Sequence, residues 1–177
     1  MDTTALDRFE KTLEDGLVKI CRSEGLLDET MTSPDIDRMW EAYMKDYVAD
    51  AVENFNDYPA AALGFAAFLG MAVANRWDSD WDSAKDAPYR SYYGPRGFDD
   101  MDDHILEDVL RLEPDCAKKV SGAVGSCVWS TLALIRHEAI EAQTADGFYA
   151  LVRCYCVMFR IGASIELKRL GYSKVKI

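Results

Sequence analysis

Hydrophobic residues recur every three or four positions along most of the chain, the spacing that places them on one face of an α-helix. The first such segment covers residues 4–23, and its apolar stripe consists of Leu6, Phe9, Leu13, Leu17 and Ile20. Gly25 follows the stripe, and glycine commonly ends a helix. The pattern therefore predicts a first amphipathic helix over residues 4–23.

Five further segments have helical patterns. Ser33 as a cap and Pro34 as the first helical residue predict a second helix from residue 34 to about 57. Residues 59–77 are apolar nearly all round, as in a central core helix, and Gly64 and Gly70 within them would be explained by close approach of another helix. Three more helices are predicted over about 99–112, 114–143 and 147–170. The predicted fold is all-α: one domain, residues 1–177, with about six helices in an up-and-down bundle.

Residues 78–98, between the third and fourth predicted helices, form a long loop. Such loops are usually functional or disordered, and disordered segments are poor in aromatic residues. This loop and its borders are rich in them: Trp77, Trp81, Tyr89, Tyr92, Tyr93 and Phe98. We therefore expect an ordered loop that closes one end of the bundle. Its candidate ligand-binding or partner-binding residues are Trp81, Tyr92, Tyr93 and Arg96.

Glu166 is a further candidate because it lies in the apolar stripe of the last predicted helix. A carboxylate in such a position must be paired, protonated or catalytic. We expect it to pair with a core-facing arginine such as Arg136 or Arg76.

The acids at the start of the long loop resemble part of a calcium loop. Asp78, Asp80 and Asp82 occupy its positions one, three and five. The motif then fails, because Ser83 stands where a glycine is needed and Tyr89 where a bidentate glutamate is needed. The sequence thus excludes an EF-hand. It leaves a looser metal site as an alternative to the favoured arrangement, in which these acids bind backbone N–H groups or arginines.

A second acidic cluster, Asp99, Asp100, Asp102 and Asp103, begins the fourth predicted helix. Acids at a helix start complement the helix dipole. Four exceed what capping requires, and their mutual repulsion predicts a neighbouring cation. We favour an arginine, with Arg96 the closest in sequence, over a metal ion.

The end of the fifth predicted helix carries potential metal ligands. His137 and Glu141 are four residues apart, so they would share a helix face, and Glu138 is a third candidate. The segment lacks the Glu-x-x-His pairs of di-iron bundles and the second histidine of zinc peptidases.

Glu138-x-x-Glu141 also resembles the all-α nucleotide pyrophosphatases, which hold magnesium with Glu-x-x-Glu and Glu-x-x-Asp pairs on neighbouring helices. The resemblance implies Asp50-x-x-Glu53 and Glu166 as partners of such a site. The chain departs from that pattern, because the third residue after Glu166 is an arginine.

The formal net charge of −11 argues against binding to nucleic acid or to an anionic membrane. The charge is uneven, with nine acids against two bases in residues 28–57 and one acid against six bases in residues 147–177. An acidic helix beside a basic helix is the favoured explanation. A basic groove for an acidic ligand is the alternative.

The five cysteines all lie in helical patterns, which indicates reduced and mostly buried thiols in a cytoplasmic protein. The acidic N-terminal segment does not resemble a signal peptide. The most apolar run, residues 59–74, is shorter than the roughly 18–20 residues of a membrane span. We therefore expect a cytoplasmic protein without a membrane segment.

Three motifs carry a resemblance to a group of proteins: Trp77-Asp78-x-Asp80-Trp81, the run GFDDMDD at 97–103, and Glu166-Leu167-x-Arg169-Leu170-Gly171-Tyr172. In these the chain resembles uncharacterised all-helical bacterial proteins of similar length. The resemblance implies a bacterial helical protein, and it implies no activity and no catalytic residues.

The chain contains no recognisable nucleophile motif and no glycine-rich phosphate loop. We expect a helical binding or interaction domain without catalytic activity or cofactor, which binds a second copy of itself, a protein partner or a small ligand. One alternative is a hydrolase of phosphorylated small molecules or nucleotides that uses magnesium or manganese. Its candidate ligands are Asp78, Asp80, Asp99, Asp102, His137, Glu138 and Glu141. The other alternative is a structural bundle plugged by its own loop.

Overall fold

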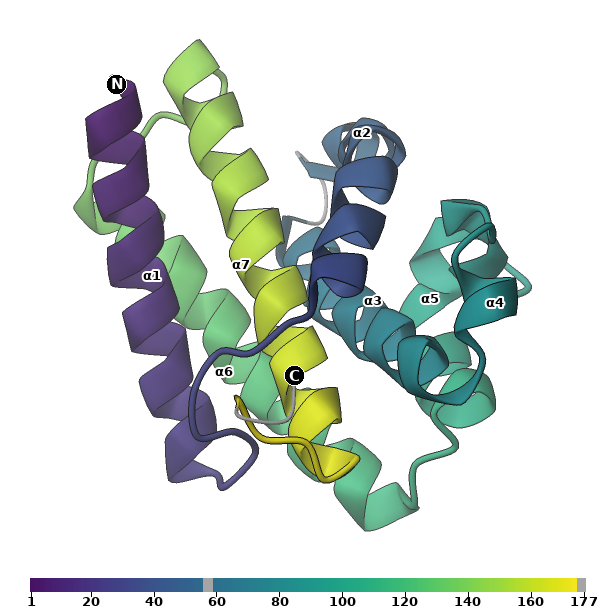
Figure 1. The fold of residues 1–177 in the computed structure, drawn as a ribbon. Coiled ribbons are helices and arrows are strands. Elements are labelled where there is room, and N and C mark those ends of the chain that lie inside the picture. The colour runs from purple at the N-terminus through teal and green to yellow at the C-terminus, as the bar shows by residue number, and fades with distance from the viewer. Residues whose placement is uncertain (56–58, 175–177) are drawn as a thin grey trace.

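The computed structural model describes residues 1–55 and 59–174, and within them it contains seven α-helices and no β-strand (Figure 1). The predicted all-α fold is confirmed. The helices are α1 (Thr3–Ser23), α2 (Pro34–Phe55), α3 (Pro59–Ser79), α4 (Trp81–Ala84), α5 (Met101–Asp103), α6 (Pro114–His137) and α7 (Ala145–Arg169). Two 3₁₀ turns, η1 (Tyr89–Tyr92) and η2 (Phe98–Asp100), and a π-helix, η3 (His104–Val109), complete the described elements.

The packing of α3 against α7 is the most extensive helix–helix contact of the fold. At the crossing a Cβ atom on Gly70 would lie 2.0 Å from the carbonyl oxygen of Phe159, and one on Gly162 would lie 1.8 Å from that of Ala67. The two backbones therefore touch, which confirms the close approach expected at Gly70. At Gly64 the nearest atoms are side chains of α6 at an ordinary 3.7 Å.

The basic helix α7 is neutralised mainly by α1. Arg160 donates hydrogen bonds to Glu10 and Glu14 over 2.7 and 2.8 Å, and Arg153 also pairs with Glu10. From the described part of the acidic segment 28–57, Asp28 pairs with Lys168, and Glu29 pairs with Lys174. The basic residues of α7 thus have acidic partners, and they form no open basic groove.

The segment between α3 and α6 is ordered, as its aromatic residues predicted. Tyr89 and Tyr92 are buried. The ring centroid of Tyr89 lies 5.7 Å from that of Tyr47, and the ring centroid of Tyr92 lies 6.1 Å from that of Tyr43. The segment contains more helix than expected, because α3 continues to Ser79 and is followed by α4 and η1. The fourth predicted helix is a succession of η2, α5 and η3. In Figure 1, α4 and α5 lie on the opposite side of α3 from α1.

Helix α6 is shorter than predicted. It ends at His137, six residues before the expected boundary, because Ala139 adopts a left-handed φ of 54°. The amide of Ile140 then donates to the carbonyl of Ile135 over 3.1 Å, a bond that closes a helix end. Alanine rarely adopts this conformation, so the sequence carried no signal for the turn.

Two helices combine a length above 18 residues with a largely apolar composition. By length and composition, Ala60–Ser79 and Ala145–Arg169 could each cross a membrane, which corrects the length assigned to the apolar run. However, 72% and 67% of their apolar windows are buried within the protein. Core helices of soluble proteins have the same property.

Candidate functional site

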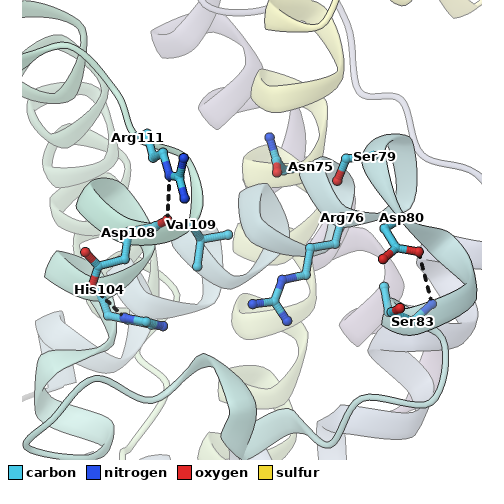
Figure 2. Close-up of a pocket in the computed structure, with 10 residues that line it drawn as sticks. Asn75, Arg76, Ser79, Asp80, Ser83, His104, Asp108, Val109 and Arg111 are labelled. Carbon is cyan, nitrogen blue, oxygen red and sulfur yellow. Dashed lines mark hydrogen bonds and ion pairs between the residues drawn. The ribbon is translucent and has the colours of Figure 1, made fainter.

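A pocket of about 470 Å³ opens between the end of α3, α4 and the π-helix η3 (Figure 2). This volume lies within the range of about 300–1,000 Å³ typical of small-molecule sites. The lining residues are Asn75, Arg76, Ser79, Asp80, Ser83, Ala84, His104, Asp108, Val109 and Arg111. Most are polar, which is typical of a site for a polar ligand.

Arg76 enters the pocket from the last turn of α3 (Figure 2). Its guanidinium carbon lies 4.7 Å from the centroid of the Tyr92 ring, a cation–π geometry. Burial raises the pKa of Tyr92, and the nearby Arg76 only partly offsets this, so the ring stays neutral at pH 7. Arg76 forms no salt bridge with a carboxylate in the described part of the chain. The fold therefore holds this charge in place without neutralising it.

Arg111 contributes the second positive charge, from the residues just after η3. Its φ of 51° is left-handed, a conformation that costs a non-glycine residue about 1–2 kcal/mol. Its Nε donates to the carbonyl oxygen of Asp108 over 3.4 Å. Among residues 1–55 and 59–174, no carboxylate forms a salt bridge with it. A strained backbone thus places an unpaired guanidinium at the pocket.

The two carboxylates of the pocket already have partners. Asp108 lies 2.9 Å from Nδ1 of His104, and Asp80 accepts a hydrogen bond from the backbone N–H of Ser83 over 3.3 Å. In Figure 2 the His104 ring and the Arg76 guanidinium point toward one another across the pocket. The groups left free to meet a ligand are therefore mostly donors, which suit an oxyanion.

Glu166 is fully buried, and its partners differ from those expected. It accepts two hydrogen bonds of 2.7 Å from Arg169 and one of 2.9 Å from Nδ2 of Asn75. The expected pairing with Arg136 or Arg76 is therefore wrong. Glu166 does not line the pocket, but it fixes the side chain of Asn75, which does.

The candidate binding residues of the loop do not converge. Trp81 is half-buried against the core, and Tyr93 donates its hydroxyl proton to Asp50. Arg96 is exposed and pairs with Asp100 at 3.0 Å, which confirms an arginine as the cation of the second acidic cluster. Tyr92 is fully buried and reaches the pocket only through Arg76.

The structure separates the residues proposed as metal ligands. Asp78 accepts a 2.6 Å hydrogen bond from the Tyr172 hydroxyl, Asp80 caps α4, and Asp99 is exposed. Asp102 is half-buried, and burial raises the pKa of its carboxyl group. Within the described ranges, no three His, Cys, Asp or Glu side chains are placed to hold a metal ion together.

The ligand set at the end of α6 is also separated. His137, Glu138 and Glu141 are all exposed, and only His137 belongs to the helix, so the shared helix face predicted for them is wrong. The pyrophosphatase-like set does not form either, because Glu166 is held by Arg169. The side chain of Glu53 lies outside the described residues.

Among the pocket residues that the sequence analysis did not propose, three are ionisable: His104, Asp108 and Arg111. The first two carry a usable signal, because they are four residues apart in a helical segment and can pair on one face. Arg111 has no such signal, since its side chain reaches the pocket through a backbone conformation that favours glycine.

Comparison with protein families, with curated proteins and with solved structures found no match to this chain. The similarity to bacterial helical proteins stays a prediction. The function is therefore argued from the geometry of the pocket.

Proposed function

We propose that this protein is a soluble cytoplasmic binding protein whose ligand is a small molecule with a phosphate group, held in the pocket between Arg76 and Arg111. The observation that carries the proposal is the absence of carboxylate partners for these two arginines in the described part of the chain. Three arginines are half-buried: Arg76, Arg153 and Arg160. Arg153 and Arg160 are paired with acids of α1. Arg76 is the exception, and it faces a pocket.

A phosphate group fits the donors better than a carboxylate does. Guanidinium groups bind phosphate through paired N–H donors, and Arg76 and Arg111 approach from different elements, so they can contact different oxygens of a tetrahedral anion. The hydroxyls of Ser79 and Ser83 add further donors on the α3–α4 wall. The pocket also has room for an organic group beyond the phosphate.

Isothermal titration with inorganic phosphate, a nucleoside monophosphate and acetate tests the proposal. We expect the phosphate compounds to bind more tightly than acetate, with affinity falling as salt is added. Arg111→Gly should weaken phosphate binding by roughly 10-fold or more, because a hydrogen bond to a charged group contributes about 1.5–3 kcal/mol.

The same variant separates binding from folding. Glycine is favoured at a φ of 51°, so Arg111→Gly should leave the thermal midpoint unchanged or raise it. Arg136→Ala is the matched control, because it removes an exposed arginine of α6 that does not line this pocket. Equal losses of affinity in the two variants, or binding of acetate as tight as that of phosphate, would overturn the proposal.

A further inference from the structure

Two cysteines far apart in the sequence meet in the core. Sγ of Cys21, in the last turn of α1, lies 3.5 Å from Sγ of Cys127, in the middle of α6. Both side chains are fully buried, and all five cysteines are free thiols. This is the one pair of cysteine sulfurs in contact within the described residues.

We propose that Cys21 and Cys127 are an oxidation site, at which a peroxide converts the two thiols into a disulfide that joins α1 to α6. A disulfide bond is about 2.05 Å long, so the sulfurs need to approach by about 1.5 Å. The sulfurs already touch in the core, so the bond requires a local adjustment of the two side chains and of the helix turns that carry them.

The environment favours Cys21 as the attacking sulfur. The hydrogen bond with the Cys127 thiol lowers the pKa of Cys21, against the opposing effect of burial. The same bond, together with burial, raises the pKa of Cys127. Since the thiolate is the nucleophile, these directions agree with the place of Cys21 in the last turn of α1, where an oxidant can arrive.

The position of Cys21 also provides a route for the oxidant. The turn that carries it is the last of α1, and the next four residues, 22–25, are exposed. Helix ends open locally far more often than the whole protein unfolds. Such an opening would admit a molecule as small as hydrogen peroxide. By contrast, Cys154 lies in the middle of α7, surrounded by the core.

The reaction proceeds in two balanced steps. The Cys21 thiolate attacks one peroxide oxygen, the O–O bond breaks, and the departing hydroxide takes up a proton to become water, which leaves a sulfenic acid. The Cys127 sulfur then attacks the Cys21 sulfur, and the S–O bond breaks. The departing hydroxide takes the Cys127 thiol proton. Two thiols and one peroxide thus yield one disulfide and two waters, and a reducing thiol reverses the change by exchange.

Peptide mass spectrometry of the full chain tests the proposal directly. After treatment with hydrogen peroxide, alkylation and tryptic cleavage without reductant, we expect residues 20–22 linked to residues 120–136, at a mass lower by two hydrogen atoms than the two reduced peptides together. Each cysteine-containing peptide is distinct, because Cys116 falls in 112–118 and the remaining two cysteines in 154–160. Dithiothreitol should abolish the link, and the oxidised protein should unfold at a higher temperature.

Two controls decide the outcome. Cys116→Ser, at a half-buried cysteine of the same helix, should leave the linked peptide unchanged, and Cys127→Ser should remove it. Oxidation of Cys116 or Cys156 while Cys21 and Cys127 stay alkylatable would overturn the proposal. So would sulfinic acid at Cys21 without a link, or an equal yield of all cysteine pairs in the folded and the urea-unfolded protein.

Discussion

The crossing of α3 and α7 predicts a large effect from the smallest possible side chain. In Gly162→Ala the new methyl carbon would lie 1.8 Å from the carbonyl oxygen of Ala67 and 2.6 Å from its carbonyl carbon. Ordinary contact begins at 3.4 Å, so the nearest atoms would be about 1.6 Å too close. The obstacle is the backbone of a buried helix, which no side-chain rotation can move aside. The two central helices would therefore have to separate.

The loss in the free energy of unfolding follows from two opposing effects. Overpacking a core typically costs about 1–3 kcal/mol, and a backbone clash belongs at or above the upper limit. Alanine regains about 1 kcal/mol over glycine in a helix. The net loss is thus at least about 2 kcal/mol, which lowers the thermal midpoint by roughly 4–8 °C for a chain of this size.

Thermal unfolding followed by circular dichroism measures the effect, with Gly122→Ala as the matched control. Gly122 is exposed on α6, and no atom lies within 4 Å of its Cβ position. The same substitution should there stabilise the protein by roughly 0.5–1 kcal/mol. Midpoints that move in the same direction in both variants would refute the close approach of α3 and α7.

Three further predictions concern buried polar groups. The Tyr155 hydroxyl is buried without a hydrogen-bond partner in the described residues, whereas the Tyr47 hydroxyl donates to a backbone carbonyl. Tyr155→Phe should therefore stabilise the protein and Tyr47→Phe should destabilise it, as measured by chemical denaturation. Burial raises the pKa of Glu10, but its bonds with two arginines, Arg160 foremost, outweigh burial and hold the pKa below 4.5. The ionised carboxylate therefore stabilises the fold above that pH, and this contribution disappears as the pH falls through the folded pKa. Compared with the unchanged protein, Glu10→Gln should be less stable at pH 7, and its stability should decline less steeply in an acid titration below pH 4.5. Glu166→Gln should cost about 1.5–3 kcal/mol in urea unfolding, because it removes the charge from the hydrogen bonds with Arg169, whose own charge stays partly exposed to water. A loss under about 1 kcal/mol would contradict the pairing.

Local sequence signals account for most helix boundaries. The spacing of apolar residues and the cap at Ser33 located α1, α2, α3 and α7 within a few residues, because these signals act within one or two turns. The end of α6 was misplaced because it depends on an alanine in a left-handed conformation. The pairing of Glu166 with Arg169 was available as a three-residue spacing in a helix, although the direction of the two side chains was not.

The candidate site shows where local reasoning ends. Of the residues singled out from the sequence as binding or metal-ligating candidates, only Asp80 lines the pocket, while Tyr92 and Glu166 support it from behind through Arg76 and Asn75. The sequence by itself determined the class of fold, the core faces of the long helices and the fact that the aromatic segment is ordered, because hydrophobic spacing and caps depend on near neighbours. Only the tertiary structure decided which charges are neutralised and which stay free. That outcome depends on distances between segments tens of residues apart, and these are set by how the helices pack.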